Sequence, residues 1–223
     1  MRLLVAWMVA AVVVIATRGA EDAAVGPRIA GAAREQIGVT TSYDPKYVVL
    51  KYPGGDVPMS TGVCSDVVVR ALRKVGIDLQ KEVHEDMGKN FSTYPQKWGL
   101  KAPDKNIDHR RVANLMRYFE GQHLAVSEGW DRPETYRPGD LVTWDLGGGV
   151  LHIGVVSDRS SGGIPLIIHN IGGGAREGDV LFKYRVIGHF RMKAVAPSER
   201  PANGGQPGRA GTDRVSAAVG AGR

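Results

Sequence analysis

Residues 61–79 read TGVCSDVVVRALRKVGIDL, and this stretch decides the fold and contains the single cysteine of the 223-residue chain. From Cys64 onward apolar residues recur at helical spacing until Gly76, and glycine commonly ends helices. We therefore expect a helix that begins at Cys64, with its apolar residues on one face and Arg70 on the solvent side. A thiol at a helix N-terminus lies at the positive end of the backbone dipole, which favours the thiolate. The pattern predicts a reactive cysteine, and a buried inert thiol is the alternative.

The first twenty residues predict export. Arg2 is followed by an unbroken apolar run, residues 3–16, and then by small residues. This layout is typical of a secretory signal peptide, and the run is short for a membrane span. We expect a signal peptide at residues 1–20, a periplasmic or extracellular location and no stable membrane insertion after its removal.

The formal net charge of +6 is spread along the chain. Residues 1–20 and 194–223 each contribute +2, which leaves +2 for residues 21–193. A part so close to neutral, without a basic and aromatic stripe, argues against nucleic-acid binding. Residues 194–223 are rich in Gly, Pro, Ala and Arg and are predicted to be disordered.

The remaining pattern predicts helices first and strands afterwards. Further helices are expected at residues 28–37 and 108–120, with a polar, irregular segment at 78–106 between them. Five short β-rich runs follow, at residues 140–145, 151–158, 165–171, 179–184 and 185–192. Helices followed by a mostly antiparallel sheet predict an α+β domain over residues 21–193. Within it, residues 78–138 form a helical or irregular insert that we expect to set specificity.

Two histidines lie in the predicted strands. A cysteine hydrolase needs a nucleophile, a base within hydrogen-bonding reach and a group that orients the base. His152 is the candidate base and His169 the candidate orienting group, with Asn170 as a substitute for the latter. Gly154 shares the strand face of His152 and is expected to leave room there for substrate or for the cysteine helix.

The motifs GVCSD, GDLVTW, HIGVV and IIHN, in this order, resemble those of the NlpC-type cell-wall cysteine peptidases of the papain-like superfamily. More narrowly, residues 34–193 resemble the bacterial family catalogued as domain of unknown function 1287. The resemblance implies a papain-like fold, with the nucleophile helix packed on the sheet. It implies Cys64, His152 and His169 as catalytic residues. It also implies that Tyr52, twelve residues before Cys64 in YPGGD, lines the oxyanion region.

The sequence departs from the broader pattern beside the cysteine. Val63 stands where an aspartate is usual, and Asp66 stands where a glycine is usual. An anionic Asp66 is expected to raise the pKa of the thiol and to oppose the helix dipole. Arg110 and Arg111 fall in the first turn of the helix predicted at 108–120, where a cation is poorly placed. We therefore expect one of these two arginines to bind a substrate carboxylate.

Together these features predict an exported cysteine hydrolase that cleaves an amide bond in peptidoglycan peptides, as an endopeptidase or an amidase. Two alternatives stay open: a catalytically degenerate module that binds wall peptides, and a papain-like acyltransferase or amidase with another substrate. The expected partner is a peptidoglycan peptide. No metal or organic cofactor is implied, and the sequence does not indicate an oligomeric state.

Overall fold

The computed structural model describes residues 25–193. The signal peptide predicted at residues 1–20 and the disordered tail predicted at 194–223 lie outside the described residues. The described chain opens with a helix over residues 25–34, three residues earlier than predicted. Between residues 25 and 193 there is no helix with the length and apolar character needed to cross a membrane.

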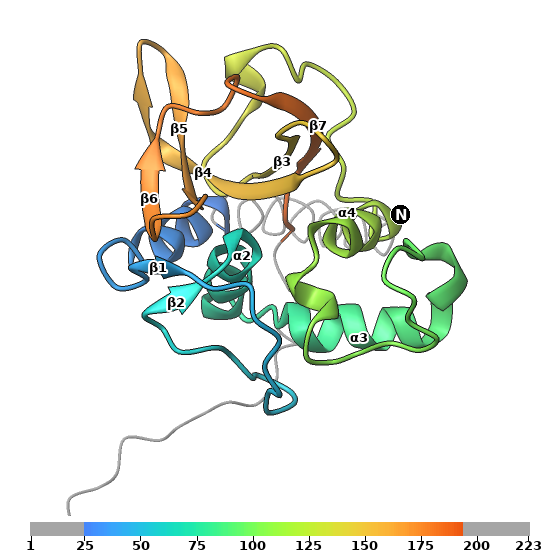
Figure 1. The fold of residues 1–223 in the computed structure, drawn as a ribbon. Helices are drawn as coiled ribbons and strands as arrows, with labels where there is room; N and C mark the ends of the chain where they lie inside the picture. Colours follow the sequence, from blue (N-terminus) through green and yellow to red (C-terminus); the bar gives the residue numbers. More distant parts are fainter. Residues whose placement is uncertain (1–24, 194–223) are drawn as a thin grey trace, which may run out of the picture.

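A five-stranded antiparallel sheet lies on one side of the molecule, and the helices lie on the other (Figure 1). The order of the strands is β6-β5-β4-β3-β7. Their bounds are β3 Leu141–Asp145, β4 Leu151–Ser161, β5 Ile164–Asn170, β6 Ala175–Gly178 and β7 Arg185–Phe190. Two short strands, β1 (Ser42–Tyr43) and β2 (Thr61–Gly62), pair in parallel beside α2. The predicted α+β class is confirmed.

Four of the five predicted β-rich runs are strands, and the run at residues 179–184 is not. Residues 181–183 form a turn, and the buried Leu181 carbonyl accepts a hydrogen bond from the indole Nε1 of Trp144 at 2.8 Å. Its apolar residues therefore pack against the sheet rather than extend it. The strand β6 was missed because its sequence, AREG, lacks the β-branched residues that mark strands.

The helix α2, Cys64–Lys74, begins at Cys64 as predicted. Its N-terminus is closed by Asp66, whose carboxylate accepts the backbone N–H of Val63 at 2.6 Å. Gly76 follows the helix with φ of 93°, a conformation that glycine adopts without strain. Arg70 is not on a solvent face: it is 5% exposed and pairs with Asp56 at 2.8 Å. The loop between β1 and β2 covers this side of the helix.

The segment predicted as irregular contains a helix, α3, at Leu79–Asn90. Asp78 caps it by accepting the backbone N–H of Gln80 at 3.2 Å. Leu79, Val83 and Met87 form its buried face at a spacing of four residues. Only three of its twelve residues are apolar, so the helical periodicity is too weak to predict α3 from the sequence. The capping residue Asp78 is the signal that could have indicated it.

The helix predicted at residues 108–120 is interrupted. Asp108–Arg110 form a 3₁₀ turn, Arg111 is extended with φ −98° and ψ 113°, and α4 runs over Val112–Gly121. Asp108 does not cap α4, because its carboxylate accepts the backbone N–H of Asp104.

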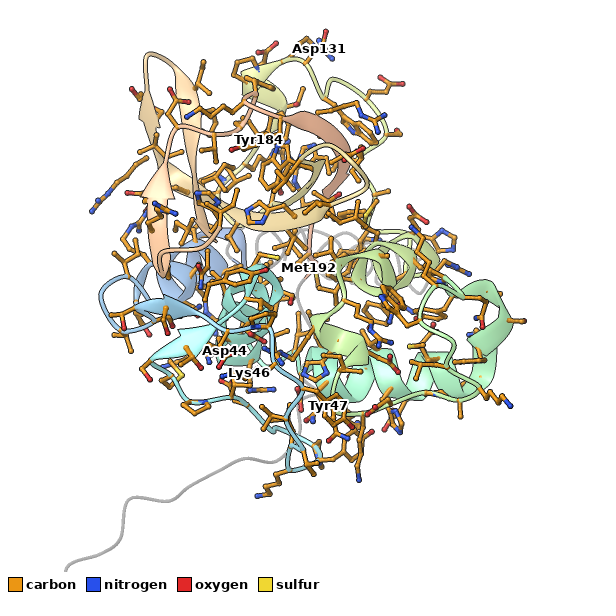
Figure 2. All side chains as sticks on the ribbon, viewed as in Figure 1. Asp44, Lys46, Tyr47, Asp131, Tyr184 and Met192 are labelled. Carbon is orange, nitrogen blue, oxygen red and sulfur yellow. The ribbon has the colours of Figure 1, made fainter. Side chains whose placement is uncertain are left out.

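The sheet buries apolar residues on both faces. On one face, Ile153, Val155 and Ile168 pack with Cys64 and α2. On the other face, a second cluster contains Val142, Trp144, Val156, Ile167 and Leu181. Figure 2 shows Met192 between the sheet and the helices, where the chain leaves β7 and joins the first cluster.

Gly154 does not have the predicted role. A Cβ atom at this position would lie 2.6 Å from the Cγ2 of Ile167 and 3.2 Å from the Cβ of His169. The glycine therefore lets β5 approach β4 closely, and it leaves no space for substrate or for α2.

Candidate functional site

Cys64 is the first residue of α2 and is 5% exposed. Burial raises the pKa of its thiol to about 11, while backbone N–H groups of Ile153, Ser65 and Cys64 itself act in the opposite direction. The N–H of Ile153 places the sulfur against the backbone of β4, one residue after His152. The charge of Asp66 also raises the thiol pKa, as expected, but less than burial does. The thiol is therefore neutral at pH 7.

The structure brings His152 of β4 and His169 of β5 together. The Nε2 of His152 lies 2.9 Å from the Nδ1 of His169, and the two residues are 3% and 2% exposed. Burial and then the neighbouring His169 lower the pKa of His152 to about 3. Burial and then Arg176 lower the pKa of His169 to about 4. Both rings are therefore neutral at pH 7, and one of the facing nitrogens donates to the other.

The thiol and the histidine pair lie on opposite sides of β4. Ile153 points toward Cys64 and α2, and alternation along the strand turns His152 to the other face. There its ring packs on Trp144, with the ring centroids 5.7 Å apart. Over residues 25–193 no hydrogen bond joins the sulfur to either imidazole. The Nδ1 of His152 is the nitrogen that His169 leaves free.

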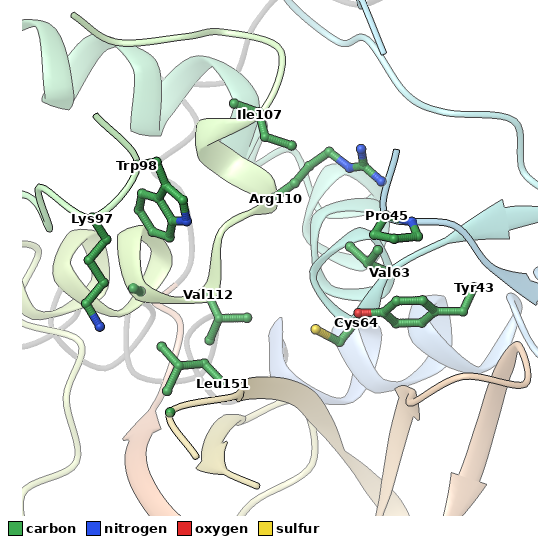
Figure 3. A pocket seen from close by; sticks show the side chains of 12 residues that line it. Tyr43, Pro45, Val63, Cys64, Lys97, Trp98, Ile107, Arg110, Val112 and Leu151 are labelled. Atoms are coloured by element: carbon green, nitrogen blue, oxygen red, sulfur yellow. The ribbon is translucent and has the colours of Figure 1, made fainter. Parts of the chain in front are cut away.

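A pocket of about 340 Å³ opens on the thiol. Figure 3 shows Tyr43 beside Cys64, with its hydroxyl group directed at the sulfur. Burial is the main cause of a raised Tyr43 pKa, and the negative form of Cys64 adds to it. Sequence reasoning missed this tyrosine. Its position follows from the β1–β2 pairing, in which Tyr43 lies opposite Gly62, two residues before the cysteine.

Tyr52 is not among the residues that line this pocket. Its ring packs edge-on against His84 of α3, with centroids 5.2 Å apart, and the Lys105 ammonium lies 5.7 Å from the ring centroid. The spacing of twelve residues therefore does not bring Tyr52 to the thiol here, because the chain turns away onto α3. The tyrosine that lies beside the thiol is Tyr43.

Asn170 does not contact the histidine pair. Its Nδ2 donates to the carbonyl oxygen of Gly62 at 2.9 Å and to that of Ser42 at 3.2 Å. It therefore ties the end of β5 to the two short strands that carry Tyr43 and lead to Cys64. In the structure His169, and not Asn170, is hydrogen-bonded to His152.

Arg110 lines the pocket, but its guanidinium is already occupied. Its Nε and Nη2 each lie 2.9 Å from an oxygen of Asp66. Its two Nη groups also donate to the backbone carbonyls of Lys46 and Asp44, two residues labelled in Figure 2. The side chain is only 2% exposed. This arginine therefore neutralises Asp66 beneath the thiol, and binding of a substrate carboxylate would break that pair.

Arg111 is also partnered. It lies over the ring of Trp98, 4.2 Å from the centroid, and pairs with Asp108 at 3.2 Å. Both guanidinium groups thus have partners within the protein, and the binding of a substrate carboxylate by Arg110 or Arg111 stays a prediction. Among residues 25–193 there is also no group of three or more His, Cys, Asp or Glu side chains placed to hold a metal ion.

The fold and the site define an α+β protein in which a lone thiol at a helix N-terminus packs on one face of a strand and a histidine pair lies on the other face. A model of the family described as "Domain of unknown function (DUF1287)" matches residues 30–192, and the chain belongs to this family. The "Uncharacterized protein YijF" of Escherichia coli (strain K12) is 60% identical over 164 residues, which cover 73% of this chain and 80% of YijF. No solved structure matches the chain.

Proposed function

We propose that this protein is an exported cysteine hydrolase of the papain-like, NlpC type, which cleaves an amide bond in peptidoglycan peptides. The observation that carries the proposal is the placement of a thiol at the start of α2, against the backbone of β4, the strand whose His152 is hydrogen-bonded to a second histidine. A nucleophile, a base and an orienting group are the components of thiol acyl transfer. The cleaved bond is that of an endopeptidase or an amidase, since both reactions use the same groups.

The proposed mechanism uses one of the two tautomers open to the neutral histidine pair. In it the Nε2–H of His152 donates to the Nδ1 of His169. The Nδ1 of His152 then carries a lone pair and takes the proton of Cys64. The resulting imidazolium keeps its Nε2–H on His169, and this charge-assisted hydrogen bond stabilises it.

The thiolate attacks the amide carbonyl, and the nitrogen leaves with the proton held by His152. The backbone N–H of Cys64 and the hydroxyl of Tyr43 stabilise the oxyanion. Water then hydrolyses the thioester and restores the thiol. Because thiol and imidazole are both neutral and lie on opposite sides of β4, the proposed proton transfer requires a rearrangement on substrate binding that brings the Nδ1 of His152 to the sulfur.

The test is digestion of purified sacculi by the mature protein, with released muropeptides identified by liquid chromatography and mass spectrometry. Cys64→Ala should abolish release, and Cys64→Ser should retain at most traces. The control is Ser60→Ala, an exposed position near the start of α2, which should be fully active. Full activity of a folded Cys64→Ala protein would refute the proposal.

A binding module is the second candidate, and one observation favours it. A thiol with a pKa of about 11 that makes no hydrogen bond to an imidazole is the state expected of an inactive relative. This candidate predicts that the wild-type protein sediments with sacculi but releases no muropeptides, and that Cys64→Ala binds equally well. Release that depends on Cys64 decides for the hydrolase.

A further inference from the structure

Lys97 lines the pocket and, among residues 25–193, has no ion-pair partner. Two charged residues line the pocket, Arg110 and Lys97. Arg110 is neutralised by Asp66, whereas among residues 25–193 no carboxylate lies within ion-pairing distance of Lys97. The Lys97 side chain is exposed, so its ammonium is available to a ligand.

Lys97 and the thiol lie at opposite ends of the pocket. Figure 3 shows the lysine beside Trp98 on one wall and Cys64 with Tyr43 on the other, with Val112 and Leu151 between them. The Trp98 ring is fixed by Arg111, which stacks on it at 4.2 Å. A group held at Cys64 therefore extends over an apolar floor toward an ammonium.

We propose that Lys97 is a specificity-determining residue, which binds a carboxylate of the substrate on the side of the pocket away from the thiol. The substrate class is a peptide with an anionic residue or a free C-terminus separated from the scissile carbonyl by an apolar spacer. An ammonium on a flexible stem accepts a carboxylate in several positions, and its positive charge favours an anion throughout the open pocket. This inference rests on the proposed hydrolase function for its substrate, but the position of the charge can be tested without it.

The first experiment uses two alkylating agents of similar size at pH 9, neutral iodoacetamide and anionic iodoacetate. The ratio of their second-order rates with Cys64 reports the potential at the thiol. At low ionic strength Lys97→Met should lower the iodoacetate-to-iodoacetamide ratio about two- to threefold, and Lys97→Glu further. The matched control is Lys101→Met, which removes an exposed lysine outside the pocket lining and should leave the ratio unchanged. High salt should reduce the difference.

The second experiment compares peptide substrates that differ only in a carboxylate or a carboxamide. Lys97→Met should raise KM about tenfold for the carboxylate peptide, leave kcat nearly unchanged and not affect the carboxamide peptide. A purely structural role would change both peptides equally.

The outcomes separate the two proposals. An alkylation ratio that Lys97→Met does not change overturns the role of Lys97 and leaves the hydrolase intact. A thiol that reacts with neither agent before denaturation also overturns it, because the pocket would not reach the sulfur. If Lys97→Met lowers the ratio and the Cys64→Ala protein still hydrolyses the substrate, the role of Lys97 is supported and the proposed cysteine hydrolase is refuted.

Discussion

The buried polar groups on the two sides of β4 differ in charge. On the side of α2, Asp66 and Arg110 form a bidentate ion pair whose side chains are 4% and 2% exposed. On the other side, His152 and His169 share one hydrogen bond, and both rings are uncharged at pH 7 because burial lowers their pKa values. The ion pair is suited to holding a backbone in place, because both of its partners also bond to backbone groups. A neutral imidazole pair has lone pairs that can accept a proton, although the burial that lowers its pKa values opposes this until the surroundings change.

This difference in charge separates the residues that position the site from those proposed to take part in the chemistry. Asp66 accepts the N–H of Val63, and Arg110 spans from Asp66 to the carbonyls before and after Pro45. This network therefore fixes the start of α2 and the segment that follows Tyr43. The histidines contribute no such bridges. Their shared hydrogen bond leaves the Nδ1 of His152 and the Nε2 of His169 free, and the Nδ1 of His152 is the atom proposed to take the proton of Cys64.

The largest expected effect is on the histidine side. His152→Ala should lower the rate of sacculus digestion by at least about 10³-fold, because the base is removed. His169→Asn should cost less, about 10- to 100-fold, since a carboxamide oxygen still accepts the Nε2–H of His152. Steady-state release of muropeptides measures both. Equal losses in the two variants would mean that the pair acts as a structural unit rather than as base and orienting group.

The next effect concerns the ion pair and is expected in stability. Arg110→Met should destabilise the protein by about 3–5 kcal/mol, because Asp66 is left charged and buried without a partner. The double variant Asp66→Asn, Arg110→Met should recover part of this loss, since the amide carries no charge. Urea unfolding followed by circular dichroism gives both values. A double variant as unstable as the sum of the two single variants would contradict the pairing.

Most of the fold was predictable where one local rule decides the structure. The α2 helix begins at Cys64 and ends before Gly76, and β4 and β5 carry their histidines in neighbouring strands, all as the sequence patterns indicate. These elements have strong apolar periodicity or a glycine at the required position. The helix α3 and the strand β6 lack that periodicity, and they owe their structure to the elements that pack on them.

The candidate site was predictable in its residues but not in its contacts. Arg110 is predicted to be free because nothing in the sequence shows that Asp66, 44 positions earlier, folds beneath it. Tyr52 has the expected spacing, but Tyr43 reaches the pocket through the short parallel pairing of β1 and β2. Long-range partners of this kind depend on how loops cross in space, which spacing along the chain does not encode.

A smaller effect is expected in mild acid, where the two histidines of the pair gain protons on unfolding. The buried His109, whose pKa burial lowers to about 4, contributes in the same pH range. Unfolded histidines titrate near pH 6.5, whereas His152 and His169 have pKa values of about 3 and about 4 in the folded protein. Below pH 6.5 the unfolded state therefore binds more protons, and stability falls as the pH drops toward 4. Each histidine should contribute a slope approaching about 1.4 kcal/mol per pH unit between pH 6 and pH 4.5.

Urea unfolding at several pH values measures this slope. His169→Asn removes one titrating group and should make the slope shallower by about one proton, and the exposed variant Ser60→Ala should not change it. A slope that His169→Asn leaves unaltered would mean that this ring is protonated in both states, and the neutral pair would be refuted.

The smallest effect tests Tyr43 on the cysteine side. Tyr43→Phe keeps the ring against Cys64 but removes the hydroxyl, so stability should change little. The hydroxyl is one of two proposed oxyanion donors, and Tyr43 is 39% exposed, so it should contribute about tenfold to kcat, less than a fully buried donor would. Tyr52→Phe is the matched control and should have no effect, because that ring packs on His84. If Tyr52→Phe lowers kcat and Tyr43→Phe does not, the twelve-residue spacing identifies the oxyanion tyrosine, and the loop before α2 rearranges when substrate binds.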